Sequence, residues 1–218
     1  METGPNRVAL AEMIKQFLLI IVALGLTKAF EILADRLDWK TAGVFLVYVL
    51  ICTRFLLGNW LYISKLGVLY ETPAGTETRP HIRFEATAVF LTGMVLGWQS
   101  NYTEANKLFL FFVLFVVTLL VNATVWPMFL HVYAQPNNNF LSSRERSDIE
   151  DSILNDVVFF FLSGIFIVIL WVYNFDQTSP LYATAYMLLG IFATINSVRS
   201  FIITVRTYLR NNQKPNEA

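Results

Sequence analysis

Residues 41–63 read TAGVFLVYVLICTRFLLGNWLYI, and Arg54 is the one charged residue among them. At 1.5 Å per residue, a helix over this stretch is about 35 Å long, enough to cross the roughly 30 Å hydrocarbon core of a bilayer. The stretch therefore predicts a transmembrane helix that carries a charge inside the membrane.

Similar apolar blocks lie on both sides of this stretch, at about residues 14–34, 84–99, 107–132, 156–174 and 181–205. The chain is 56% hydrophobic and 15% charged, with a mean hydropathy of +0.53. A soluble domain of 218 residues has too little interior to bury that much apolar side chain. We therefore expect an all-α polytopic membrane protein with six transmembrane helices in three hairpins. Residues 1–210 form a single transmembrane domain, and residues 211–218 are a polar tail.

Local sequence signals predict the first residues of two helices. Pro180 suits the first position of a helix, where its missing N–H is not needed. Ser147 and Glu150 have the spacing of a capping box, which predicts that the fifth helix begins there.

The basic residues near the helix ends predict the orientation, because they are enriched on the cytosolic side of membrane proteins. Three of them belong to one side of the predicted bundle: Arg36, Lys40 and Lys107. Ten belong to the other side: Arg7, Lys15, Lys65, Arg79, Arg83, Arg144, Arg146, Arg206, Arg210 and Lys214. The asymmetry predicts an integral membrane protein with both termini in the cytosol.

An internal repeat is suggested by two of the odd-numbered blocks. An acid lies eight residues before a glycine in both, as Glu85 with Gly93 and as Asp156 with Gly164, and Phe-Leu-Thr or Phe-Leu-Ser precedes each glycine. Three hairpins of the same orientation would form a parallel repeat. Chance matching in apolar sequence is the alternative.

Charges within the spans are the strongest functional clue, because each is costly in hydrocarbon unless it is paired or hydrated. The cations are Lys28, Arg54 and Arg199, and Glu85 and Asp156 begin helices at a depth that would let them act as counter-charges. The cluster is either a set of structural ion pairs or part of a path for ions or solutes. Lys28 and Glu31, three residues apart, form an ion pair or line an outer vestibule.

Uncharged residues add to this picture. Asn122 and Asn196 lie in the even-numbered blocks, like Arg54 and Arg199, and extend the predicted pore or buried polar network. Pro127 frees a backbone carbonyl near Asn122 and predicts a kink or hinge. Gly93 and Gly97 form a GxxxG motif for close helix packing, within or between subunits.

The sequence contains few residues of the kinds that act in catalysis. His81 and His131 are the only histidines, Cys52 is the only cysteine, and no catalytic or cofactor fingerprint is present. We expect no catalytic residues, no cofactor and no metal site. Sixteen basic and sixteen acidic residues without a polybasic run disfavour nucleic acid as the main partner.

These observations predict a homo-oligomeric ion channel or pore-forming effector in the lipid bilayer. A cytosolic protein that binds residues 64–83 and 134–155, where mixed charges gather, would gate it. The alternative is a non-conducting membrane subunit that anchors, assembles or regulates such a partner. A lipid-modifying or redox enzyme is the third interpretation.

Overall fold

The protein is all-helical over the residues that the computed structural model describes, which are 5–71, 79–104, 107–133, 143–172 and 180–212. No β-strand occurs in these ranges. The elements are α1 (Pro5–Asp35), α2 (Trp39–Glu71), α3 (Arg79–Gln99), the 3-10 helix η1 (Ser100–Tyr102), α4 (Leu108–Tyr133), α5 (Ser143–Val172) and α6 (Pro180–Asn212).

The helix starts follow local chemistry in most cases. Pro5 and Pro180 occupy the first positions of α1 and α6. Asp38 caps α2, because its Oδ1 accepts hydrogen bonds from the backbone N–H groups of Lys40 and Thr41 at 2.8 and 2.9 Å. The carboxylate thereby satisfies donors that have no partner inside the helix.

The predicted start of the fifth helix is wrong. α5 begins at Ser143, four residues before the capping box that the sequence suggested. Glu150 is engaged elsewhere, since its Oε1 accepts from Nε of Arg146 at 2.9 Å. An ion pair one helical turn apart thus replaces the expected cap.

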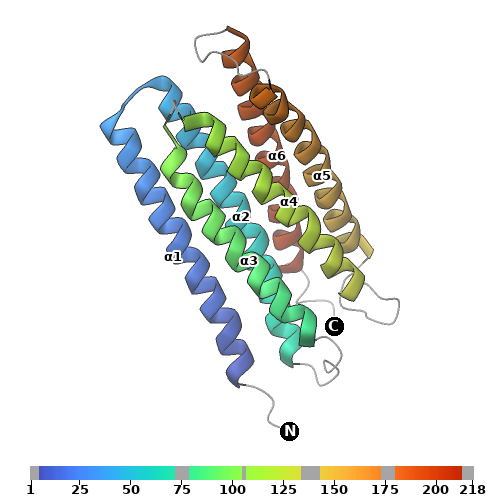
Figure 1. The fold of residues 1–218 in the computed structure, drawn as a ribbon. Helices are drawn as coiled ribbons and strands as arrows, with labels where there is room; N and C mark the ends of the chain where they lie inside the picture. The colour runs from blue at the N-terminus through green and yellow to red at the C-terminus, as the bar shows by residue number, and fades with distance from the viewer. Residues whose placement is uncertain (1–4, 72–78, 105–106, 134–142, 173–179, 213–218) are drawn as a thin grey trace.

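The helices form one bundle in which successive helices run in opposite directions (Figure 1). We call the end where α1, α3 and α5 begin the proximal end, and the end where α2, α4 and α6 begin the distal end. The start of α1 and the finish of α6 both lie at the proximal end. Neighbours pack in the order α1, α2, α6, α5, α4, α3 and back to α1.

This order does not place the predicted hairpins in a symmetric ring. The first meets the third through α2 and α6, the third meets the second through α5 and α4, and the second meets the first through α3 and α1. A cyclic repeat would use the same pair of helices at each junction. If the sequence repeat exists, its copies therefore pack in three different ways.

Four helices contain segments long and apolar enough to cross a membrane, within the described part of the chain. These segments are Glu12–Asp35, Trp39–Gly58, Glu150–Val172 and Tyr182–Ile203. Large apolar side chains point outward on them, including Leu24, Phe161 and Trp171. A surface of this kind suits an integral membrane protein, because lipid and not water covers it.

The glycines of α3 face the inside of the bundle. A Cβ added to Gly93 would lie 3.2 Å from Cδ2 of Leu18, and one added to Gly97 would lie 3.2 Å from Cγ2 of Ile21. The two missing side chains therefore let α3 approach α1 within one chain. This GxxxG face is covered by α1 and is not the free surface that contact between subunits would need.

Candidate functional site

A buried polar cluster joins the middle of α2 to α5 and α6. Nη1 of Arg54 donates a hydrogen bond of 2.6 Å to Oδ1 of Asn196, and Nη2 of Arg54 donates to Oδ1 of Asp156. Nδ2 of Asn196 donates to the same Asp156 oxygen at 3.1 Å. The three side chains therefore form a closed triangle of contacts, which we call the Arg54 cluster.

The Arg54 cluster lies deep in the bundle. Arg54 is 15 residues from the start of α2 and 17 from its end, which is about 22 Å and 26 Å along the helix axis. The exposed fractions of the Arg54 and Asp156 side chains are 9% and 1%. At this depth neither charge reaches bulk water, so each depends on the other for compensation.

Several buried polar atoms near the cluster have no hydrogen-bond partner among the described residues. They are Oδ2 of Asp156, both polar side-chain atoms of Asn155, and the hydroxyls of Ser197 and Ser200. Asn155 and Asp156 are adjacent on α5, while Ser197 and Ser200 share the inward face of α6 with Asn196. Buried polar groups are normally satisfied, so this pattern fits a small hydrated space or a polar solute between α5 and α6.

The distal half of the bundle interior is packed with large side chains. Tyr48, Phe111, Phe115, Leu119 and Leu189 are fully buried there. The Tyr48 hydroxyl donates to the Leu96 carbonyl at 2.9 Å, and its ring meets Phe111 edge-on at a centroid distance of 6.3 Å. These contacts leave the polar cluster on the proximal side of an aromatic layer.

Among the described side chains proposed for the pore, Arg199 and Asn122 form no hydrogen bond with this cluster. The Arg199 side chain is exposed, and Asn122 is half-buried on α4. The side chains of Glu85 and Pro127 lie outside the described residues. The backbone of α4 remains helical through Pro127 as far as Tyr133.

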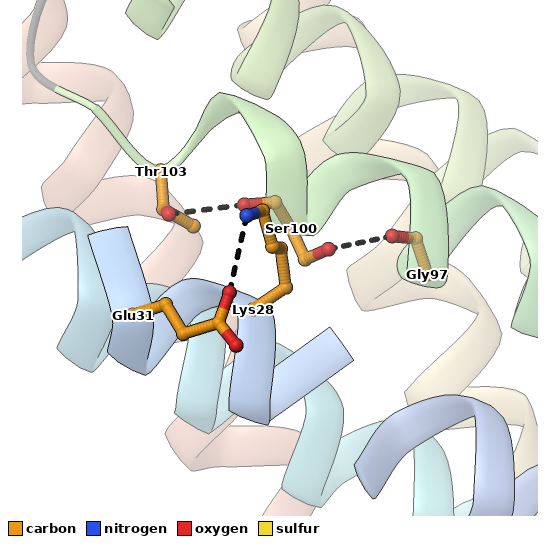
Figure 2. Close-up of polar contacts among 5 residues, drawn as sticks. All are labelled: Lys28, Glu31, Gly97, Ser100 and Thr103. Carbon is orange, nitrogen blue, oxygen red and sulfur yellow. Dashed lines mark hydrogen bonds and ion pairs between the residues drawn. The ribbon is translucent and has the colours of Figure 1, made fainter. Parts of the chain in front are cut away.

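Lys28 and Glu31 form an ion pair within the distal part of α1. Nζ of Lys28 lies 3.1 Å from Oε2 of Glu31, and both side chains are at least half exposed. Figure 2 shows the pair beside the end of α3, where Ser100 donates to the Gly97 carbonyl at 2.7 Å and Thr103 donates to the Ser100 carbonyl at 3.0 Å. One carbonyl in the last turn of α3 and one in η1 thereby gain a hydrogen-bond partner where the helix tightens into η1.

Sequence reasoning did not select Asn155, Ser163, Ser200 or Gln99, all of which are buried. Ser200 follows Asn196 by four residues, a spacing that places both on one helix face. That spacing could have indicated that Ser200 is buried beside Asn196. Gln99, whose Nε2 donates to the Phe111 carbonyl at 3.0 Å, gave none because it lies at a helix end.

No group of three or more His, Cys, Asp or Glu side chains that could hold a metal ion occurs among the described residues. In comparisons with known proteins, no family model, curated protein or solved structure matches the chain.

Proposed function

We propose that the protein is an ion channel with six membrane spans in three hairpins, and that the Arg54 cluster is the hydrated, charge-bearing section of its path. The observation that carries the proposal is the buried Arg54–Asp156 pair with unsatisfied polar atoms beside it. A pair that served packing alone would be expected to have its remaining lone pairs and donors satisfied. Water entering this space would satisfy them and prepare a route for ions.

Two observations support the proposal of six spans: four helices are long and apolar enough to cross a membrane, and α3 and α4 run beside them in the same bundle. The excess of basic residues at the proximal end supports a cytosolic location for that end and for both termini.

In this proposal the described conformation is closed. Tyr48, Phe111 and Phe115 fill the distal interior without exposure, so ions pass only after this aromatic layer moves. Apolar constrictions of this kind close channels by excluding water. Movement of α5 and α6 away from α2 would separate Arg54 from both Asp156 and Asn196 and would leave a fixed positive charge of α2 on the path. We therefore propose a preference for anions.

Gating by a cytosolic protein at residues 64–83 and 134–155 remains part of the proposal. The described part of these segments includes exposed Arg146, Glu150 and Asp151 at the start of α5. A partner bound there would act on the helix that carries Asp156. We also propose a homo-oligomer, with its contacts on outward faces such as that of α5, because the GxxxG face packs inside the chain.

A non-conducting membrane subunit is the second candidate. The same aromatic layer favours this candidate, because a protein that conducts no ions can keep the interior of its bundle filled permanently. We propose no enzymatic activity.

Flux into liposomes separates the two candidates. Purified protein in vesicles loaded with a chloride indicator is compared with Arg54→Gln and with Arg199→Gln, which removes an exposed arginine of α6. A channel gives chloride flux above empty vesicles, a reduced chloride-to-cation permeability ratio in Arg54→Gln, and no change in Arg199→Gln. Flux equal to that of empty vesicles, with and without a cytosolic extract as a source of the partner, would reject the channel in favour of the subunit.

A further inference from the structure

A groove separate from the Arg54 cluster lies in the distal half of the bundle, between α2 and α6, with α4 as its floor. Its volume is about 760 Å³. This lies within the range of about 300 to 1,000 Å³ that is usual for small-molecule sites. Six of the residues that line it mark its extent: Trp39, Lys40, Val47, Phe112, Tyr182 and Ile195.

The groove has the length and polarity of a site for a hydrocarbon chain. From Tyr182 to Ile195 it follows α6 for 13 residues, or about 20 Å. One leaflet of the hydrocarbon core is about 15 Å thick. Met187 and Ile191 line the groove and are exposed, so it opens sideways toward the surroundings of the bundle. An elongated apolar molecule could therefore enter from the membrane.

Two glycines keep the groove wide. A Cβ added at Gly43 of α2 or Gly190 of α6 would meet no atom within 4 Å. These glycines therefore differ from Gly93 and Gly97, whose missing side chains are required by contact with α1. Glycine destabilises a helix interior relative to alanine, and no close contact within the protein requires it at positions 43 and 190.

The distal mouth of the groove is cationic and aromatic. Nζ of Lys40 lies 5.6 Å from the ring centroid of Trp39. The nearby Asp38 carboxylate is bonded to the backbone N–H groups of Lys40 and Thr41, and no described carboxylate forms an ion pair with the Lys40 ammonium. Tryptophan and lysine are the side chains that occupy the headgroup level of a membrane. The mouth is thus complementary to an anionic headgroup.

We propose that this groove binds one anionic phospholipid, with an acyl chain between α2 and α6 and its phosphate at Lys40. The inference does not depend on conduction, because a non-conducting subunit would bind the same lipid. Lipid binding and ion flux can therefore fail independently.

The test uses the full chain in nanodiscs of equal parts phosphatidylglycerol and phosphatidylcholine, followed by release into detergent and native mass spectrometry of retained lipid. The wild-type chain should retain one phosphatidylglycerol. Gly190→Leu should lose most of it, because a Cβ at this position meets no atom within 4 Å and the rest of the side chain occupies space in the groove. Gly164→Leu is the matched control, since its Cβ also meets nothing within 4 Å and Gly164 does not line the groove.

The headgroup is tested with Lys40→Gln. One lysine near the headgroups accounts for roughly a fivefold preference for anionic lipid, so the preference should fall by about that factor. Lys107→Gln, at the same end but outside the groove, should leave it unchanged. Equal retention of both lipids by the wild-type chain, undiminished retention in Gly190→Leu, or a crosslink between Gly190→Cys residues of two copies would each overturn the proposal.

Discussion

Nη1 of Arg54 lies 2.6 Å from Oδ1 of Asn196, although 142 positions separate the two residues in the chain. The contact ties the middle of α2 to α6 and holds the guanidinium where it also reaches Asp156. The planar guanidinium of Arg54 holds its N–H donors in fixed directions, and two of its nitrogens donate to side chains of two different helices. The position of the arginine is therefore fixed by α5 and α6 together.

Removing one member of the pair should destabilise the fold strongly. Arg54→Ala leaves the Asp156 carboxylate buried without its counter-charge, and we expect a loss of about 3 to 5 kcal/mol in the free energy of unfolding. Thermal unfolding in detergent or nanodiscs measures it. Arg54→Met combined with Asp156→Leu should recover most of the loss, because an apolar pair carries no desolvation cost.

Arg199→Ala is the control for this pair. Its side chain is exposed, so the change should stay within about 0.5 kcal/mol. Equal stability of Arg54→Ala and the wild-type chain would mean that water already compensates Asp156.

Gly25 should not tolerate alanine. An added Cβ would collide with the hydroxyl of Tyr48, which donates to the Leu96 carbonyl. Overpacking of this kind costs about 1 to 3 kcal/mol. Tyr48→Phe removes the hydroxyl, so in the Gly25→Ala background it should raise the unfolding temperature, whereas alone it should lower stability by about 0.5 to 1.5 kcal/mol. The prediction is confirmed if Tyr48→Phe raises the unfolding temperature in the Gly25→Ala background and lowers it in the wild-type background.

The Asp38 cap of α2 should make the stability of the folded protein decrease at low pH. Hydrogen bonds from the backbone and hydroxyl of Thr41 hold the pKa of Asp38 below its usual 3.8. The folded protein therefore binds this proton less readily than the unfolded chain. The stabilisation is fully present above the usual pKa and is lost as the pH falls through the lowered value.

Asp38→Asn isolates this contribution, because asparagine also caps helices but does not titrate in this range. Unfolding temperatures measured between pH 6 and pH 2.5 should fall less steeply in the variant. Parallel curves for the two proteins would show that Asp38 does not contribute to the acid response.

Labelling can test the orientation of the bundle. Asn101 is exposed at the distal end and Ser147 is exposed near the proximal end, whereas the native Cys52 is fully buried. A membrane-impermeant maleimide added to intact cells should therefore modify Asn101→Cys and spare both Ser147→Cys and the parent protein. Labelling of both variants from the same side would contradict the proposed topology.

The sequence was most informative where a charged residue in an apolar block required a partner of opposite charge. Arg54 inside an apolar block had to find a counter-charge, and Asp156 was one of two acids at suitable depth. The choice between Asp156 and Glu85 could not be made, because it depends on α6 lying beside α2 and on α5 lying beside α6. That neighbour order is a tertiary property, which hydropathy does not encode.

Arg199 illustrates the opposite case. It resembles Arg54 in sequence, but the inward face of α6 carries Asn196, Ser197 and Ser200. Successive residues of a helix are rotated by about 100°, so Arg199 is placed to the side of that face. Charge alone suggested a shared site, whereas the spacing of the small polar residues defines which side of the helix is buried.

The long separation between Arg54 and its acid has a consequence for biogenesis. The 102 residues from Arg54 to Asp156 take about 5 to 20 s to synthesise at roughly 5 to 20 residues per second. During this interval α2 carries a guanidinium without the acid that compensates it. We therefore expect the first two helices to stay at the insertion machinery or in a hydrated setting until α5 and α6 arrive, because an uncompensated arginine in mid-span disfavours stable insertion.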